Sequence, residues 1–297
     1  MTESPDQNVQ PSGPRGAGPG GGPGGGGPRR RKPPRRVTVT SVSKLAPRLV
    51  SVLVSGDELD GFTDAAPTSH LKLFLPPAGS SELLLPEQGP DGPVWNHDES
   101  LRPVIRTYTP RRYDPATKTL EIQVVLHGEG PASEWAQRVA VGDQVAVGGP
   151  GGRFVLDEAA SHWWLAADES ALPALGTLLD VLPETASAEV HVEVEDSDDV
   201  IKLPSAAAVN ATWHYRYGSG DFSAALATAA REASFGGSFG GSFGSGTKIW
   251  VACESGVMRD IRRHLTRDRG IPVSQLVTRG YWRRGETNHP DHDYGED

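Results

Sequence analysis

The sequence predicts a β + α/β protein, in which an antiparallel six-stranded β-barrel is followed by an α/β domain with a parallel sheet. Between residues 36 and 156, six short β-rich runs are separated by turn-forming residues, which is typical of an all-β unit. Between residues 160 and 286, apolar strand patterns alternate with helical ones, which indicates β-α-β units and therefore a parallel sheet. A length of 297 residues also suits two domains.

The barrel is expected to be small and closed, because its strands follow one another at short intervals. A helix is expected to interrupt them at 132–139, since Gly130 and Pro131 stand just before it. The six strands are expected at 35–45, 49–56, 69–76, 105–112, 119–128 and 144–150.

The α/β domain is expected to bind its ligand at the carboxyl ends of its strands, as doubly wound sheets do. Residues 168–171 and 253–256 directly follow strands and are therefore the first candidates. We interpret the Ser-Phe-Gly-Gly repeat at 234–246 as a flexible linker, with a lid over the nucleotide as the alternative. Strands are expected at 162–167, 188–196, 211–218 and 247–255, and helices at 169–182, 221–233 and 257–270.

Two segments at the ends of the sequence are predicted to have no fold of their own. Residues 1–35 are rich in Gly and Pro and cannot bury a core. The first 36 residues hold seven basic and two acidic side chains and therefore carry a net charge of +5. Since the whole chain has a net charge of −9, the remaining residues carry −14. We expect a solvated tail rather than a nucleic-acid-binding arm, because the folded part is acidic and lacks a nucleic-acid motif. Residues 287–297 form a polar, acidic tail.

The composition excludes several other classes of protein. Cys253 is the only cysteine, which excludes an intramolecular disulfide and a cysteine-built metal cluster, and we expect it to serve packing rather than catalysis. His289 and His292 stand near aspartates, but we expect a tail there and no metal site. No run of about 18 apolar residues predicts a membrane span, and no secretory signal is recognised. We therefore expect a cytoplasmic protein, and no feature requires more than a monomer.

The stretch RTYTPRRYD, residues 106–114, combines residue types that a buried strand would not favour. Arg106 and Tyr108 project to one side of a regular strand, and Thr107 and Thr109 to the other. A cofactor that carries both a phosphate and an aromatic ring would contact the arginine and the tyrosine together. Taken alone, the stretch is better explained by a core aromatic and an ion pair at the end of the barrel.

Four motifs carry a resemblance to a known family: RTYTPRRYD, HGEGPASEWA, LAADESALPAL and GYWRRG. In this order and spacing they resemble the siderophore-interacting proteins, which are flavoproteins of the ferredoxin-reductase-like superfamily. The resemblance extends over about residues 36–285. It implies a ferric-siderophore reductase that contains FAD and uses NAD(P)H, with NADPH favoured and NADH possible.

The resemblance implies an FAD site on the first motif. Arg106 would pair with the pyrophosphate, which suits a planar guanidinium. Tyr108 would stack on the isoalloxazine ring, and Thr109 would reach the flavin N5 edge through its hydroxyl or its backbone N–H. Trp282, from the last motif, would cover one flavin face or frame the pocket.

The second motif would complete the phosphate site. Gly130 lets the backbone approach an anion, and the helix that begins near Ala132 offers free N–H groups. Ser133 would add a hydroxyl. His127 would either contact the flavin or orient the loop, and the residues leave both alternatives open.

The third motif would bind the nicotinamide nucleotide. It lacks the glycine pattern of a dinucleotide fingerprint, and its two acids would repel a pyrophosphate, so they would instead bond ribose hydroxyls. Arg216 or Arg259 would hold a 2′-phosphate. The residues implied in nucleotide binding are Asp168, Glu169, Ser170 and Ala171.

The substrate implied is a ferric siderophore, which is often anionic, so an open basic shelf near the flavin suits it. The resemblance places Lys72, Arg153 and Arg283 there. No side chain need act as acid, base or nucleophile, because a hydride would pass from NAD(P)H to FAD and single electrons to Fe(III), releasing Fe(II) for iron assimilation. Two alternatives stay open: a reductase of the same fold with another acceptor (free flavin, ferredoxin or quinone), or a siderophore-binding accessory protein without redox activity.

Overall fold

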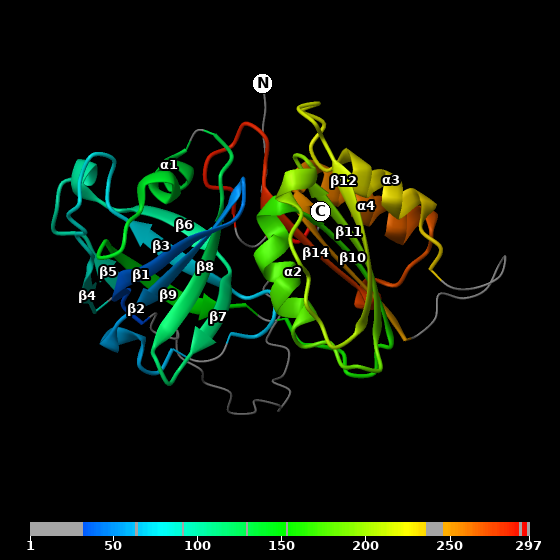
Figure 1. Cartoon of the computed structure of the whole chain (residues 1–297), viewed down its shortest axis with the longest axis horizontal. Helices are drawn as coiled ribbons and strands as arrows, with labels where there is room; N and C mark the ends of the chain where they lie inside the picture. Colours follow the sequence, from blue (N-terminus) through cyan, green and yellow to red (C-terminus); the bar gives the residue numbers. More distant parts are fainter. Residues whose placement is uncertain are drawn as a thin grey trace, which may run out of the picture. The chain divides into compact units, whose positions relative to one another are not determined.

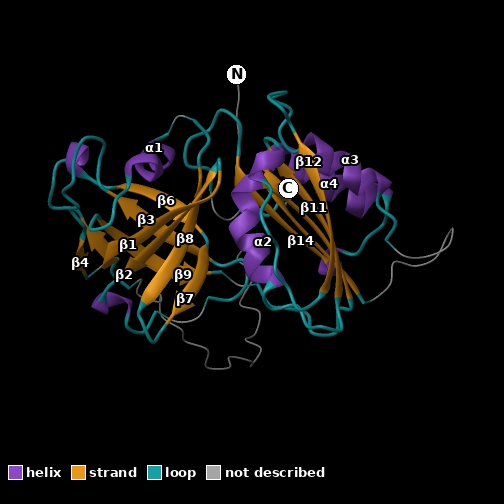
Figure 2. Ribbon diagram, viewed as in Figure 1, coloured by secondary structure: helices purple, strands orange, loops and turns teal. Residues whose placement is uncertain are grey.

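The computed structural model describes residues 32–62, 65–90, 92–128, 130–152, 154–235, 246–290 and 293–295, and residues 32–297 form one unit. The N-terminal tail, most of the Ser-Phe-Gly-Gly repeat, Arg153 and His292 lie outside the described residues. Figure 1 and Figure 2 show an antiparallel sheet built from the first half of the unit and a parallel sheet with helices built from the second half. The predicted fold class is therefore confirmed.

The antiparallel sheet has seven strands in the order β6-β3-β9-β1-β2-β8-β7. The sequence predicted six strands and a closed barrel. The sheet is instead open between β6 and β7 in the described residues, where no pairing joins these two strands. The strands are β1 Arg35–Ala46, β2 Leu49–Ser55, β3 His70–Leu75, β6 Val104–Tyr108, β7 Pro110–Asp114, β8 Thr119–Val125 and β9 Gln144–Gly151.

The seventh strand arises because the expected strand at 105–112 divides in two at Thr109. β6 pairs with β3, whereas β7 pairs with β8 at the opposite edge of the sheet. Pro110 begins β7. Proline has no N–H to donate to a neighbouring strand, so within a sheet it is found at positions such as the first residue of a strand. A separate two-stranded ribbon, β4 Glu87–Gly89 with β5 Gly92–Val94, was not predicted either.

The core of this sheet is made by alternate residues of its strands, as a sheet with one covered face requires. Leu120, Ile122 and Val124 of β8 are almost fully buried in it. Helix α1, Pro131–Arg138, packs onto the same core through Trp135 and confirms the predicted helix. The apolar face of α1 thereby fixes the position of the helix start against β6 and β8.

The second half forms a parallel sheet in the order β12-β11-β10-β13-β14. β10 is the first strand of this sheet along the chain. The chain then adds β11 and β12 on one side of β10, and afterwards β13 and β14 on the other side. The topological switch point therefore lies between β10 and β13. The edge strand β14, which includes GYW of the last motif, was not predicted. The strands are β10 His162–Asp168, β11 Ser187–Val194, β12 Ala208–Tyr215, β13 Thr247–Glu254 and β14 Leu276–Trp282.

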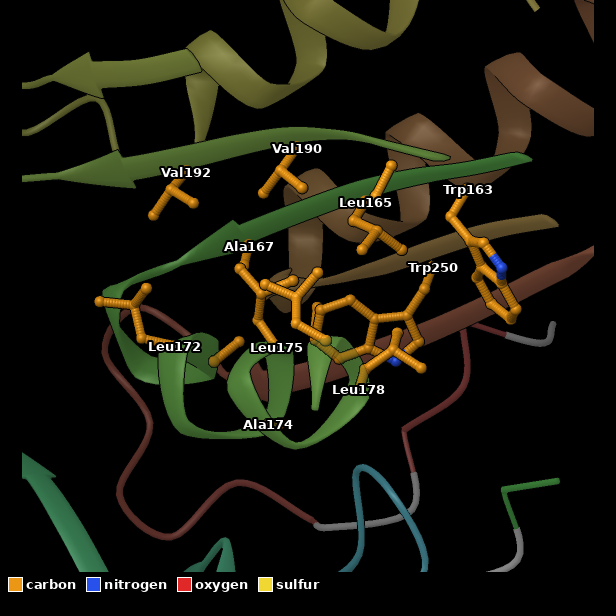
Figure 3. Packing of buried hydrophobic residues seen from close by; sticks show 14 of the residues in the cluster. Trp163, Leu165, Ala167, Leu172, Ala174, Leu175, Leu178, Val190, Val192 and Trp250 are labelled. Carbon is orange, nitrogen blue, oxygen red and sulfur yellow. The ribbon is translucent and has the colours of Figure 1, made fainter. Parts of the chain in front are cut away.

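Helices cover both faces of the parallel sheet, with α2 on one face and α3 and α4 on the other (Figure 1). Figure 3 shows how α2 places Leu172, Leu175 and Leu178 against Leu165 of β10 and Trp250 of β13. Burial on both faces explains why these strands read as continuous apolar runs. The helices are α2 Leu172–Leu179, α3 Ala224–Glu232 and α4 Ser255–Arg263, which continues as a π-turn over His264–Asp268. Short 3₁₀ turns cover Asp57–Leu59 (η1), Glu99–Leu101 (η2), Glu169–Ala171 (η3), Ser197–Asp199 (η4) and Val273–Gln275 (η6).

Part of the predicted acidic tail is folded onto β14. The backbone N–H of Gly280 donates to the carbonyl of Asp293 at 2.8 Å, and the Arg279 guanidinium lies 4.0 Å from the ring centroid of Tyr294. His289 bonds to the Asp293 carboxylate at 2.9 Å. Over the described residues, no group of three or more His, Cys, Asp or Glu has the arrangement of a metal site, and no helix is long and apolar enough to cross a membrane.

Two arginines tie the antiparallel sheet to the α/β part. Arg48, in the turn after β1, bonds to Asp199 at 2.8 Å and to Asp196 at 3.2 Å. Arg111 of β7 bonds to Asp180 at the end of α2. These ion pairs connect the antiparallel sheet to the turn after β11 and to the end of α2.

Candidate functional site

Arg106 and Tyr108 lie on the interior face of β6, as the sequence predicted. They pair across the ladder with Leu73 and Leu71, which belong to the core of the sheet. The Arg106 guanidinium is half-buried and donates to the carbonyl of Ile105 at 2.9 Å. Within the described part of the chain, no carboxylate bonds to it. Burial raises the pKa of Tyr108 well above its usual value, so its ring stays neutral.

The start of α1 is suited to an anion. Gly130 is its N-cap residue, with φ of 129°, a conformation that other residues rarely adopt. Among the described residues no side chain caps the helix, so the N–H groups of its first turn, including those of Ala132 and Ser133, are open to an anion. The buried Ser133 hydroxyl donates to the carbonyl of Gly128 at 3.3 Å, which shapes the loop.

His127 is exposed beside this helix start. Its ring lies so close to Gly130 that a Cβ there would approach the His127 Cε1 atom to 3.4 Å. The Arg106 guanidinium, which has no carboxylate partner among the described residues, and the helix start, which packs on β6, fit the pyrophosphate of FAD, and Tyr108 supplies an aromatic face beside them. Whether His127 contacts the flavin or only orients the loop stays open.

Thr109 connects the antiparallel sheet to the end of β14. It is buried and lies near the Tyr281 hydroxyl. Burial raises the pKa of Tyr281 to about 12, and the nearby Thr109 side chain opposes this rise. The predicted contact between the Thr109 hydroxyl and flavin N5 stays a prediction.

Asp168 is the centre of a hydrogen-bond network at the switch point. Its carboxylate is 2% exposed and accepts the indole N–H of Trp282 at 2.8 Å and the backbone N–H of Glu254 at 3.0 Å. The hydroxyl of Ser223 and the backbone N–H of Ser170 also donate to it. Burial, with the nearby charge of Glu169, raises the pKa of Asp168 to about 6.

Glu169 is engaged by Arg216 through both carboxylate oxygens. Arg216 has a 4% exposed side chain and also bonds Glu193 and Glu195, each at 3.3 Å. Burial would lower the pKa of Arg216, but the bonds to Glu169 and Glu193 raise it above its usual value. The predicted contacts of Asp168 and Glu169 with ribose hydroxyls stay predictions, since both carboxylates bond to protein groups here.

The remaining residues of the third motif lie at the start of α2. Ser170 donates its hydroxyl to Asp168, and Ala171 is fully buried as the N-cap residue of α2, which has no side-chain cap. Cys253 is fully buried, and burial raises its thiol pKa well above the usual value. A thiol in this state is a poor nucleophile, which agrees with its expected packing role.

The two described residues that were predicted to contact the substrate, Lys72 and Arg283, each interact with a neighbouring side chain and not with each other. Lys72 donates to the hydroxyl of Thr107 at 2.7 Å, on the face of the β3–β6 pair opposite Arg106. Arg283 is half-exposed and forms an ion pair with Glu286 at 3.3 Å. Arg153 lies outside the described residues. The basic shelf therefore stays a prediction.

The end of β14 joins residues from three of the four motifs. Tyr281 and Trp282 are the last two residues of this strand, where the register with β13 shifts by one residue. Tyr281 lies near Thr109 of the first motif, and the indole N–H of Trp282 donates to Asp168 of the third. The second motif reaches the first through the packing of α1 on β6. Sequence reasoning missed Tyr281, Glu193 and Ser223, although the first belongs to the GYW motif and Glu193 lies near the end of a strand.

Comparison with known families matches both halves of this arrangement. Residues 38–154 match the siderophore-interacting FAD-binding domain, and residues 160–285 match the siderophore-interacting protein family. The chain belongs to the siderophore-interacting protein family. The resemblance inferred from the four motifs is thereby confirmed.

Individual siderophore-interacting proteins and their relatives support the same assignment. An uncharacterised Mycobacterium tuberculosis protein is 31% identical over 84% of this chain and 90% of its own length. The ferric vibriobactin reductase ViuB of Vibrio cholerae is 29% identical over 88% of this chain and 93% of its own. The NADPH-dependent ferric-chelate reductase of Escherichia coli is 35% identical over 51% of this chain and 58% of its own. A siderophore utilization protein from T. fusca has a crystal structure that superposes with a TM-score of 0.76, at 29% identity, over 89% of this chain and 98% of its own.

Proposed function

We propose that this protein is a ferric-siderophore reductase that contains FAD and oxidises NADPH. The observation that carries the proposal is the pair of side-chain contacts at the end of β14, Tyr281 with Thr109 and Trp282 with Asp168. They bring the flavin face of the antiparallel sheet and the switch point of the parallel sheet to the same strand end. Hydride transfer between two bound rings requires this kind of proximity.

The antiparallel sheet would hold the FAD. Arg106 would bind the pyrophosphate together with the first-turn N–H groups of α1, and Tyr108 would provide an aromatic face for the ring. Bound FAD would accept a hydride from the nicotinamide and deliver electrons singly to Fe(III). The protein residues then have to bind, orient and shield the reactants, and none is required as an acid or a base.

The donor is proposed to be NADPH, since a relative is named an NADPH-dependent ferric-chelate reductase. The nucleotide would bind at the carboxyl ends of β10 and β13, where Ser170 and Ala171 begin the turn into α2. The ferric siderophore would bind near the exposed flavin edge, and Lys72, Arg153 and Arg283 would attract an anionic chelate. The predicted cytoplasmic location and monomeric state stay predictions.

Anaerobic spectroscopy tests the whole electron path. The purified protein is expected to be yellow, to bleach at its flavin bands on addition of NADPH, and to recover its colour when a ferric siderophore is added. NADH, added in a parallel experiment, measures the donor preference. Bleaching without recovery would replace the acceptor by a flavin, ferredoxin or quinone. A colourless protein that binds a siderophore tightly and cannot be reconstituted with FAD would identify a binding protein instead.

Substitution of the basic residues is expected to weaken turnover without affecting the flavin. In Lys72→Ala or Arg283→Ala protein, kcat/KM for an anionic ferric siderophore should fall about fivefold, the loss expected for one partly exposed charge contact worth about 1 kcal/mol. The flavin content should stay that of the wild type, as measured by the visible spectrum.

Lys118→Ala is the matched control, because Lys118 is a surface lysine in the turn between β7 and β8 that pairs with Asp57 at 3.1 Å. It should leave kcat/KM unchanged. If both Lys72→Ala and Arg283→Ala behave like this control with an anionic substrate, the basic shelf is wrong.

A further inference from the structure

We propose that Asp168 is a positioning residue whose carboxylate holds the indole of Trp282 across the switch point of the parallel sheet, so that a nicotinamide nucleotide must displace this indole to bind. The inference rests on the proposed function, because it takes the switch point as the nucleotide site. It gives Asp168 a different role from the ribose contact that the sequence suggests. The charged partner of the indole, rather than the indole alone, then sets the affinity for the nucleotide.

The geometry places the indole over the end of β13. Trp282 ends β14 at the edge of the sheet, whereas Asp168 ends β10, and β13 lies between these two strands. The bond of 2.8 Å from Trp282 Nε1 to Asp168 Oδ2 therefore crosses the end of the intervening strand. The same oxygen accepts the backbone N–H of Glu254, the last residue of β13, at 3.0 Å.

One further contact holds the indole in this orientation, and the Asp168 acceptor is itself held in place. Phe222 meets the Trp282 ring edge-on, with 5.1 Å between centroids and an angle of 89°. Asp168 itself is fixed by the backbone N–H groups of Ser170 and Glu254, so the acceptor does not follow the indole if the ring moves. A hydrogen bond to a buried carboxylate is stronger than one between neutral groups. Displacing the ring therefore has a free-energy cost that the nucleotide must offset.

Other tryptophans of the chain show that a buried indole N–H does not always have a hydrogen-bond acceptor in this protein. Trp163, Trp164 and Trp250 are buried, and their Nε1 atoms have no hydrogen-bond partner among the described residues. Trp282 is only half-buried, yet its N–H is directed to a carboxylate. The contact is thus a specific feature of this position.

The test compares nucleotide binding to the FAD-loaded protein in four variants. Trp282→Phe keeps an aromatic ring and removes the N–H, and Asp168→Asn keeps the size and removes the charge. Each is expected to bind NADP⁺, the donor product that cannot reduce the flavin, about tenfold more tightly than the wild type, or about 1.4 kcal/mol. The double variant should gain no more than Trp282→Phe alone, because one change removes the bond and the other only weakens the same bond.

Ser223→Ala is the matched control, since it removes another donor to the same Asp168 oxygen, at 3.3 Å, and leaves the indole contact in place. Its dissociation constant for NADP⁺ should lie within twofold of the wild type. Calorimetric titration gives the constants, and stopped-flow bleaching by NADPH separates binding from the rate of flavin reduction.

The outcomes distinguish this inference from the proposed function. Wild-type protein that binds NADP⁺, with Trp282→Phe binding it equally or more weakly, would overturn the inference and leave the reductase intact. Additive gains in the double variant, or the same gain in Ser223→Ala, would also overturn it. Wild-type protein that neither binds NADP⁺ nor bleaches with NADPH or NADH would overturn the proposed function itself, and the inference with it. If Asp168→Asn does not fold, the comparison of Trp282→Phe with Ser223→Ala decides.

Discussion

Arg106→Ala protein is expected to lose most of its FAD during purification. The guanidinium is half-buried on the interior face of β6, next to Tyr108, and no carboxylate of the described residues neutralises it. A bidentate, charge-assisted contact with a pyrophosphate contributes about 3 kcal/mol, so its removal should raise the dissociation constant of FAD about 100-fold. The ratio of flavin to protein absorbance, followed by titration of the apoprotein with FAD, measures both effects.

Arg112→Ala provides the control within the same motif. Arg112 lies six residues further along the chain, on β7, and is exposed. Its removal deletes the same charge from the same stretch and should leave the flavin content unchanged. Equal FAD retention by the Arg106→Ala and wild-type proteins would show that the pyrophosphate is bound elsewhere, and the assignment of the first motif would be wrong.

Arg216→Met is expected to destabilise the protein by about 3–5 kcal/mol, because it leaves buried carboxylates without their common partner. The Glu193 side chain is 1% exposed, and Glu169 and Glu195 are also partly buried around the guanidinium. Burial already raises the pKa of Glu193, because the charged carboxylate is less stable in a buried environment than in water. Urea unfolding at pH 7, well above the usual pKa of a glutamate, measures the loss.

Nucleotide binding decides between this structural role and the alternative that Arg216 holds a 2′-phosphate. A structural arginine predicts that the ratio of the dissociation constants of NADP⁺ and NAD⁺ stays within twofold in the folded variant. A selective loss of NADP⁺ binding would contradict this prediction. Arg263→Ala is the stability control, since its ion pair with Asp260 lies on the surface and should contribute less than about 0.5 kcal/mol.

Most strands could be predicted from the sequence because their residues repeat with a period that burial imposes. β8 has apolar, buried residues at the alternate positions Leu120, Ile122 and Val124, and β10 is a continuous apolar run covered by helices on both faces. β14 was missed because LVTRGYW alternates only weakly and includes an arginine and a glycine. Its place at the edge of the sheet, where burial is less complete, accounts for the weak pattern.

The division of RTYTPRRYD at Thr109 was also missed, and it changes the site. A single strand would direct Thr109 away from Arg106 and Tyr108, and this was expected. The structure ends β6 at Tyr108, buries Thr109 between two strands that lie at opposite edges of the sheet, and places it near Tyr281. The partner is 172 residues away in the chain, so no local pattern contains it.

The sequence by itself determined the two-part fold, the family and the motif residues Arg106, Tyr108, Gly130 and Asp168, because periodicity, turn residues and motif order are local properties of the chain. Only the tertiary structure decided what the charged residues do. Asp168 and Glu169 look alike as neighbours in sequence, yet one accepts the indole N–H of Trp282 and the other binds Arg216. The physical reason is that a buried charge must be hydrogen-bonded or paired, so its function depends on the groups around it. Those groups come from strands that are distant in the sequence and end at the same edge of the sheet.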